Sequence, residues 1–290
     1  MNSRVDYSLL CIAVLIAASL FNVSFAQSQT KDDLSSVTQI YSYAAEHKLI
    51  EKPIGEVVVQ IGKQFIGQPY AAHTLDDTGA EHLVVNLQEF DCVTLIENSL
   101  ALARCVKESR LSFDAFRREL EHIRYRGGNL AGYPSRLHYF TEWIRDNVAK
   151  SVLKDVTKEL GGQEVRKELN FMTTHRDSYD QLRQDSLFSA MQEVEEQISA
   201  RSYYYIPKQK VHSIESKLQD GDIIAITTSV GGLDVSHTGI AVKGADGRIH
   251  LLHAPNVHET VTITKETLVQ YLREHKKDTG IIVARAAEVK

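Results

Sequence analysis

Cys92 is the side chain in this sequence best placed for covalent chemistry, because it stands where a polar turn gives way to a helical pattern. The residues after it keep the spacing of one buried helical face: Leu95, Ile96, Ser99, Leu100 and Ala103. Asp91 is a suitable N-cap, which would place the thiol in the first turn of the helix. There the helix dipole and unpaired backbone N–H groups favour the thiolate, the nucleophilic form of cysteine.

Two histidines far downstream could serve such a nucleophile. His237 and His253 lie on β-rich runs that flank residues 244–247, and the Asp-Gly pair in that loop is a strong hairpin signal. A three-residue loop ending on a left-handed Gly247 would set His253 opposite Gly239, with His237 as its diagonal neighbour on the same face. A plain four-residue loop would put the histidines on opposite faces. The glycine after aspartate favours the three-residue loop, so we expect the histidines within reach of each other.

A thiol and two histidines are the components of nucleophilic amide hydrolysis. His237 would take the thiol proton as general base and later protonate the leaving amine. His253 would hold His237 in its productive orientation, as the third member of a triad does. The alternatives are histidines with no chemical role, and a metal site completed by Cys92 or Asp234. The sequence has neither an HExxH motif nor paired CxxC motifs, so we expect no metal and no cofactor.

The first 26 residues have the features of a signal peptide. Arg4 precedes an apolar run over residues 9–21, which is too short to span a membrane with ease, and small residues stand at the cleavage positions before Gln27. An uncleaved membrane anchor is the alternative. No later stretch is long and apolar enough to cross a bilayer, so we expect an exported, periplasmic chain without stable membrane association.

Charge and cysteine content limit the partners and the redox chemistry. The net charge of −5 argues against binding to nucleic acid. After removal of the signal segment, Cys92 and Cys105 remain. On one helix they would stand roughly 20 Å apart, which is too far for a disulfide. An exported protein that keeps an unpaired thiol often needs it for chemistry, whereas a buried inert thiol describes Cys105 well.

The order of the predicted elements indicates an α+β fold. Helical patterns occupy 37–45, 54–66, the segment from Cys92, 113–123, 136–147 and 186–199. Strand patterns occupy 223–227, 237–242, 248–253 and 280–284, with a covering helix over 264–274. Residues 151–185 fit no element. A helical first half followed by an antiparallel sheet, with no internal repeat, predicts a single domain over residues 27–290 that carries added helices.

Four sequence blocks resemble, in order, the signature blocks of the NlpC-type cell-wall peptidases: Gly67-Gln68-Pro69-Tyr70, Phe90-Asp91-Cys92, Ser236-His237-Thr238-Gly239-Ile240 and Leu252-His253-Ala254-Pro255. The resemblance implies a papain-like fold with Cys92 as nucleophile, His237 as base and His253 as the polar third residue. It also implies that Tyr70 lines the site.

Two departures from the general pattern point to a subfamily. The segment between Tyr70 and Cys92 is long, and Val93-Thr94 replaces the usual Ser-Gly. Together with segments 133–139 and 232–237, they resemble the N-acetylmuramoyl-L-alanine amidase-like proteins. That resemblance implies hydrolysis of the amide between N-acetylmuramic acid and L-alanine in small peptidoglycan fragments, with a 1,6-anhydro end as one candidate form.

Five residues are predicted to contact the substrate. Tyr70 and Ser236 belong to the signature blocks, and Tyr133 could stack on a sugar or cap its own loop. Arg136 could pair with a peptide carboxylate or lie at a helix start on the surface. Asp234 could bind substrate or hold the loop before the base.

Two other functions use the same framework. A stem-peptide endopeptidase would cut between D-glutamate and the diamino acid, and only the shape of the pocket separates it from the amidase. A non-catalytic protein that binds muropeptides would have a misaligned triad.

Overall fold

The structure of this chain is a computed structural model that describes residues 31–76, 79–255 and 259–289. The expected signal peptide, residues 1–26, lies outside the described residues. Within them, no helix combines the length and apolar character that a membrane crossing requires.

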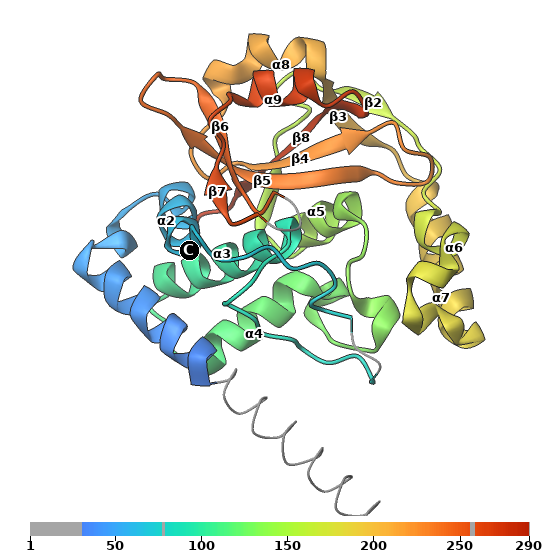
Figure 1. The fold of residues 1–290 in the computed structure, drawn as a ribbon, viewed down its shortest axis with the longest axis horizontal. Helices are drawn as coiled ribbons and strands as arrows, with labels where there is room; N and C mark the ends of the chain where they lie inside the picture. The colour runs from blue at the N-terminus through green and yellow to red at the C-terminus, as the bar shows by residue number, and fades with distance from the viewer. Residues whose placement is uncertain (1–30, 77–78, 256–258, 290) are drawn as a thin grey trace, which may run out of the picture.

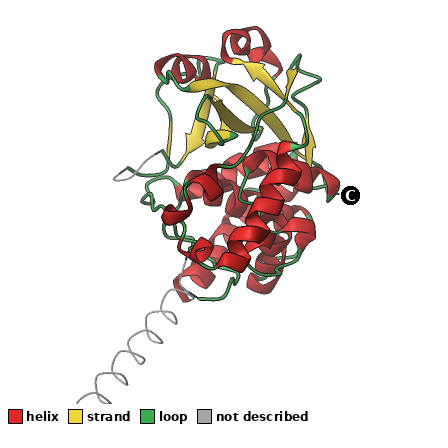
Figure 2. Cartoon of the chain, turned by 90° about the vertical axis from the view of Figure 1, so that its right-hand side faces the viewer, coloured by secondary structure: helices red, strands yellow, loops and turns green. Residues whose placement is uncertain are grey.

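Helices form most of the first half of the described chain, and an antiparallel sheet forms the core of the second half (Figure 1, Figure 2). The α-helices are residues 31–46, α2 (Ile54–Gly62), α3 (Cys92–Lys107), α4 (Phe113–Arg124), α5 (Phe140–Ala149), α6 (Phe171–Thr174), α7 (Asp185–Ser199), α8 (Lys208–Ile214) and α9 (Leu268–Glu274). The strands are β1 (Leu153–Asp155), β2 (Gln163–Val165), β3 (Tyr203–Pro207), β4 (Ile223–Thr228), β5 (Val235–Lys243), β6 (Ile249–His253), β7 (Thr262–Ile263) and β8 (Asp278–Ala286).

The sheet has eight strands in the order β2-β3-β8-β4-β5-β6-β7, with β1 paired to β8 beside β3. All of these pairs are antiparallel. The four predicted strands correspond to β4, β5, β6 and β8, with ends that differ by a few residues. The α+β prediction is therefore confirmed.

The sheet buries both faces because its strands alternate between two apolar clusters. Ile223, Ile240 and Leu252 pack with α2 and α3 in the larger cluster. Ile224 and Leu251 point the other way and pack under α8 and α9. Figure 1 shows this layering, with α8 and α9 on one side of the sheet and the helical half on the other.

Helix α3 lies at the centre of the molecule. The five residues of its predicted buried face are each 0 % exposed. The opposite face is also buried, because Glu97 accepts hydrogen bonds from Arg124 Nε at 2.7 Å and Trp143 Nε1 at 3.1 Å. A buried carboxylate needs such partners. These hydrogen bonds allow α3, which carries the candidate nucleophile, to be buried on both of these faces.

Two predicted helices begin later than expected. The helix predicted over 136–147 begins at Phe140, because Arg136 is drawn into an antiparallel bridge with Tyr125. The helix predicted over 264–274 begins at Leu268, where Thr267 provides the N-cap. Residues 151–185 contain only short elements: the strands β1 and β2, the single-turn helix α6 and two 3-10 turns before α7 begins at Asp185.

Candidate active site

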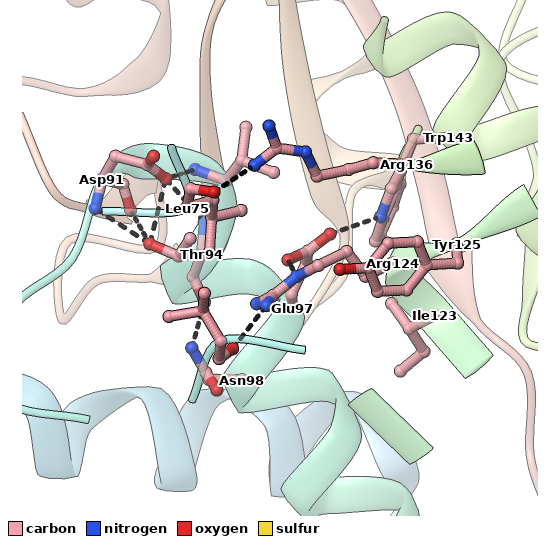
Figure 3. Close-up of polar contacts among 12 residues, drawn as sticks. Leu75, Asp91, Thr94, Glu97, Asn98, Ile123, Arg124, Tyr125, Arg136 and Trp143 are labelled. Atoms are coloured by element: carbon pink, nitrogen blue, oxygen red, sulfur yellow. Dashed lines mark hydrogen bonds and ion pairs between the residues drawn. The ribbon is translucent and has the colours of Figure 1, made fainter. Parts of the chain in front are cut away.

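Cys92 is the first residue of α3, as predicted, and Asp91 caps the helix (Figure 3). The Asp91 carboxylate accepts hydrogen bonds from the backbone N–H groups of Val93 at 2.9 Å and Thr94 at 2.7 Å. The Thr94 hydroxyl lies 2.9 Å from the Asp91 N–H and completes a capping box. The start of the helix, and with it the position of the thiol, is therefore fixed by local hydrogen bonds.

The capping arrangement does not favour a thiolate. Burial and the adjacent Asp91 carboxylate raise the pKa of the Cys92 thiol to about 11, against a smaller opposing effect of Thr238. Asp91 occupies the N–H groups of the second and third helical residues and adds its own negative charge beside the sulfur. This environment opposes the thiolate that the sequence predicts at a helix start, so the thiol needs a base before it can react.

The hairpin that carries the two histidines has the predicted register. Gly244 donates its N–H to the Arg248 carbonyl at 2.8 Å, and Gly247 has a φ of +75°. Ile240 pairs with Leu252, so the next pair in register is Gly239 with His253. His237 Nε2 lies 2.7 Å from His253 Nδ1, and the two rings meet edge to face. The three-residue loop has brought the histidines onto one face.

Gly239 leaves little room for a side chain opposite His253. A Cβ atom at that position would lie 3.3 Å from the Leu252 carbonyl oxygen and 3.4 Å from His253 Cβ, so the neighbouring strand would have to shift by a few tenths of an ångström to accept it.

Both histidines are neutral near neutral pH. Burial lowers the pKa of His237 to about 3, with a further contribution from His253 and His275. Burial also lowers the pKa of His253 to about 4, although Glu266 opposes the change. With Nε2 of His237 committed to His253, its Nδ1 is the nitrogen left to accept a proton from a thiol.

Thr238 joins this hairpin to the start of α3. Its hydroxyl donates to the Cys92 carbonyl at 2.8 Å, and its hydroxyl and backbone N–H both act on the Cys92 thiol. The thiol therefore lies against the peptide that links His237 to Thr238. The structure therefore places the start of α3 against the strand that carries His237, 145 residues further along the sequence.

Two tyrosines border the same place. The Tyr70 backbone bridges to Phe90, and Cys92 contributes to a raised pKa of its hydroxyl, after burial. The Tyr271 ring on α9 lies 6.2 Å from the His237 ring and 5.8 Å from the His253 ring, between ring centroids. Tyr70 was predicted and Tyr271 was missed. In the sequence, Tyr271 lies on a predicted helix, four residues before His275. That spacing indicates a contact with the histidine pair only once α9 is known to pack over the hairpin.

Comparison with known proteins identifies the family. Residues 60–281 match the family model described as AmiA-like, N-acetylmuramoyl-L-alanine amidase-like. The chain belongs to this family. No curated protein matches it.

Several solved structures resemble this family member. An N-acetylmuramoyl-L-alanine amidase from Bacteroides uniformis is 39% identical, with a TM-score of 0.75, over 80% of this chain and 98% of that one. A protein from Bacteroides fragilis described as a putative xylanase is 38% identical, with a TM-score of 0.73, over 77% of this chain and 98% of that one. A Legionella pneumophila protein shares the fold at 21% identity and a TM-score of 0.67, over 90% and 96% of the two chains.

In this amidase-like chain, two residues that were predicted to contact the substrate, Arg136 and Tyr133, contact other protein groups. Arg136 is buried, and its Nη1 donates to the Leu75 carbonyl at 3.0 Å (Figure 3). Its Nη2 lies 2.5 Å from Asp76 Oδ1, and its Nε lies 3.4 Å from Glu81. Its guanidinium also stacks on the Tyr133 ring, which is itself buried. These contacts tie the long segment before Cys92 to the rest of the domain.

Asp234 immediately precedes β5, the strand that carries His237, and Ser236 is the second residue of that strand. Asp234 is buried, and its Oδ2 accepts from the N–H and hydroxyl of Thr141, both at 2.7 Å. These contacts hold the loop before His237, and binding of substrate by Asp234 stays a prediction. Ser236 is exposed and donates to Asp278 at 3.1 Å.

Proposed function

We propose that the chain is a cysteine-dependent amidase that hydrolyses the bond between N-acetylmuramic acid, including its 1,6-anhydro form, and L-alanine in peptidoglycan fragments. The observation that carries this proposal is the 2.7 Å contact between His237 and His253, on a strand that is anchored to Cys92 through Thr238. Family membership supports the choice of an amide in peptidoglycan as the substrate.

The reaction begins from a neutral thiol and a neutral imidazole. His237 Nδ1 takes the Cys92 proton as Sγ attacks the lactyl carbonyl carbon, which leaves a negative oxygen on a tetrahedral carbon. Among the described residues, the N–H of Cys92 has no acceptor other than its own thiol, which moves when it attacks. We assign it to the oxyanion.

The later steps return the proton. The tetrahedral carbon collapses and expels the L-alanine nitrogen, which takes the proton from His237 Nδ1 and leaves a thioester on Cys92. Water then loses a proton to the same nitrogen as it attacks the thioester carbonyl. The second collapse releases the muramic carboxylate and restores the thiol. His253 Nδ1 accepts the Nε2–H of His237 throughout, which stabilises each transient imidazolium.

Substrate contacts are part of the proposal. Tyr70 and Ser236 stand beside the reacting groups and would contact the bound fragment. The other three predicted contacts would affect the substrate only indirectly, through the loops that they hold in place. The polar groups or rings of Tyr133, Arg136 and Asp234 already contact other protein groups. We also propose that residues 1–26 are a cleaved signal peptide and that the single mature domain, residues 27–290, acts in the periplasm.

The name of the putative xylanase relative suggests a different reaction. Most glycosidases use a pair of carboxylic acids on either side of the glycosidic bond. A thiol and a hydrogen-bonded histidine pair are instead suited to acyl transfer. The same machinery would also serve a stem-peptide endopeptidase, which remains the second candidate.

A digest of defined muropeptides analysed by mass spectrometry tests the proposal. The amidase should release a stem peptide with a free L-alanine N-terminus and intact muramic acid. Release of L-Ala-D-Glu from a tripeptide without muramic acid would assign the endopeptidase instead. Cys92→Ala should abolish release, whereas Cys105→Ala, which alters a buried thiol outside the site, should turn over like the wild type. Equal activity of the two variants would refute the cysteine mechanism.

A further inference from the structure

A cavity lies apart from the Cys92 site, between α5, the end of α7 and the start of β3. It has a volume of about 200 Å³. Cys92, His237 and His253 are not among its lining residues. All of its lining residues lie in the part of the chain that the structure describes.

Charged groups of both signs line this cavity. Arg145 and Arg201 contribute guanidinium groups that form no hydrogen bond or ion pair within the described chain. Glu142 is 5% exposed, and Arg126 pairs with its Oε1. Its Oε2 is buried with no hydrogen-bond partner among the described residues, although Arg201 attracts the carboxylate. Buried polar atoms without partners are rare in folded proteins, and a bound ligand is one way to satisfy them.

The remaining wall is apolar, and the cavity is small. Ile144, Ile198 and the Tyr203 ring line it beside the charged groups. Its volume exceeds that of the roughly 150 Å³ cavity that accepts benzene, and it is below the roughly 300 Å³ where drug-sized sites begin. A ligand of amino-acid size fits these limits.

We propose that this cavity binds a small α-amino acid with an aliphatic side chain. Its carboxylate would lie between Arg145 and Arg201, since guanidinium groups recognise carboxylates with paired hydrogen bonds. Its ammonium group would approach Glu142, and its side chain would pack against Ile144 and Ile198. An anion alone would leave Glu142 Oε2 without a hydrogen-bond donor, and a cation alone would leave the two guanidinium groups without an acceptor. The proposal does not depend on the reaction at Cys92.

Calorimetric titration of the whole chain with three matched probes tests the ligand class. L-leucine should bind saturably. 4-Methylpentanoate, which lacks only the amine, and isoamylamine, which lacks only the carboxylate, should each bind at least about tenfold more weakly, because each leaves a charged partner unsatisfied. Failure of L-leucine to bind, or equal binding of all three probes, would overturn the proposal.

Two variants locate the site. Arg201→Gln changes an exposed side chain, so the fold should survive, and it should weaken L-leucine binding about tenfold or more. Glu142→Gln keeps the size of the side chain and should weaken binding similarly. Cys92 alkylated with iodoacetamide should leave the affinity unchanged. Wild-type affinity in Arg201→Gln, or loss of binding after alkylation, would place the ligand elsewhere and refute the site.

Discussion

At the scale of single residues, the protonation states of Cys92 and His237 would set the order of events in the proposed reaction. The pKa of the thiol is raised to about 11 and that of the imidazole is lowered to about 3. Near neutral pH both groups are therefore uncharged, unlike a preformed thiolate–imidazolium pair. Proton transfer has to accompany or precede the attack, so the base is needed for the first bond to form.

The Asp91 carboxylate is predicted to restrain the reactivity of the thiol. Asp91→Asn keeps an N-cap side chain but removes the charge, so the pKa of Cys92 should fall. Each unit of decrease raises the thiolate fraction at neutral pH about tenfold. The rate of alkylation by iodoacetamide as a function of pH measures this. Glu89→Gln, which removes a nearby carboxylate that does not act on the thiol, is the control. An unshifted alkylation profile in Asp91→Asn would count against this role.

The histidine pair predicts a graded series of losses. His237→Ala should lower kcat by several orders of magnitude, near the loss in Cys92→Ala, because the base and the nucleophile act as a unit. His253→Ala should cost less, since the base still samples its productive pose. His253→Asn should recover part of that loss through a hydrogen-bond acceptor for the Nε2–H of His237. Steady-state kinetics on a defined muropeptide provide the comparison. Wild-type turnover by His237→Ala would exclude it as the base.

At the scale of elements, one hydrogen bond couples the two halves of the site. Thr238→Val removes the side-chain donor to the Cys92 carbonyl, which keeps its helical hydrogen bond as the first residue of α3. We expect a loss of about 1 kcal/mol in the free energy of unfolding, the contribution of one hydrogen bond. Turnover should also fall, because the hydroxyl holds the start of α3 against β5. Thr238→Ser, which keeps the hydroxyl, should retain most of both. Denaturant unfolding and kinetics on the same variants test this, and a fully active Thr238→Val would contradict it.

The elements that the sequence predicts well are those specified by local signals. The Asp91 cap and the apolar spacing after it define α3, and the Asp-Gly loop defines the hairpin register. Arg136 shows the limit of such signals. The residues from 136 onward do have the apolar spacing of a helix. However, the Asp76 carboxylate, 60 residues earlier in the sequence, binds the Arg136 guanidinium, and the backbone at Arg136 is extended. No local pattern carries that information.

The short elements over residues 151–185 depend on tertiary contacts in the same way. β1 has three residues, and it exists because β8 pairs with it. Tyr271 likewise gains its place beside the histidines only when α9 packs over the hairpin. The contribution of such residues to a site follows from the assembled fold.

At the scale of the whole molecule, the site forms where two separately patterned halves meet. The thiol comes from the central helix of the first half, and the histidines come from the sheet of the second half (Figure 1). Neither half alone holds the complete set. The same burial that positions the histidines also excludes their charged forms, so the site couples the stability of the fold to pH.

This coupling predicts a loss of stability in acid. Above pH 6.5, His253 is neutral in both the folded and unfolded chains and contributes no pH dependence. As the pH falls below 6.5, His253 is protonated in the unfolded chain. In the folded chain it stays neutral until the pH approaches its lowered pKa of about 4. The free energy of unfolding therefore falls by roughly 1.4 kcal/mol per pH unit for this histidine.

Unfolding by denaturant at pH 7.5 and pH 5 measures this contribution. In His253→Asn the loss between the two pH values should be about 2 kcal/mol smaller than in the wild type, because the substituted side chain takes up no proton in either state. His212→Asn, which changes a histidine whose side chain is 71% exposed, is the matched control. If His253→Asn loses as much stability as the wild type on acidification, the folded chain must accept a proton at this position, and the neutral histidine pair inferred for the site would be wrong.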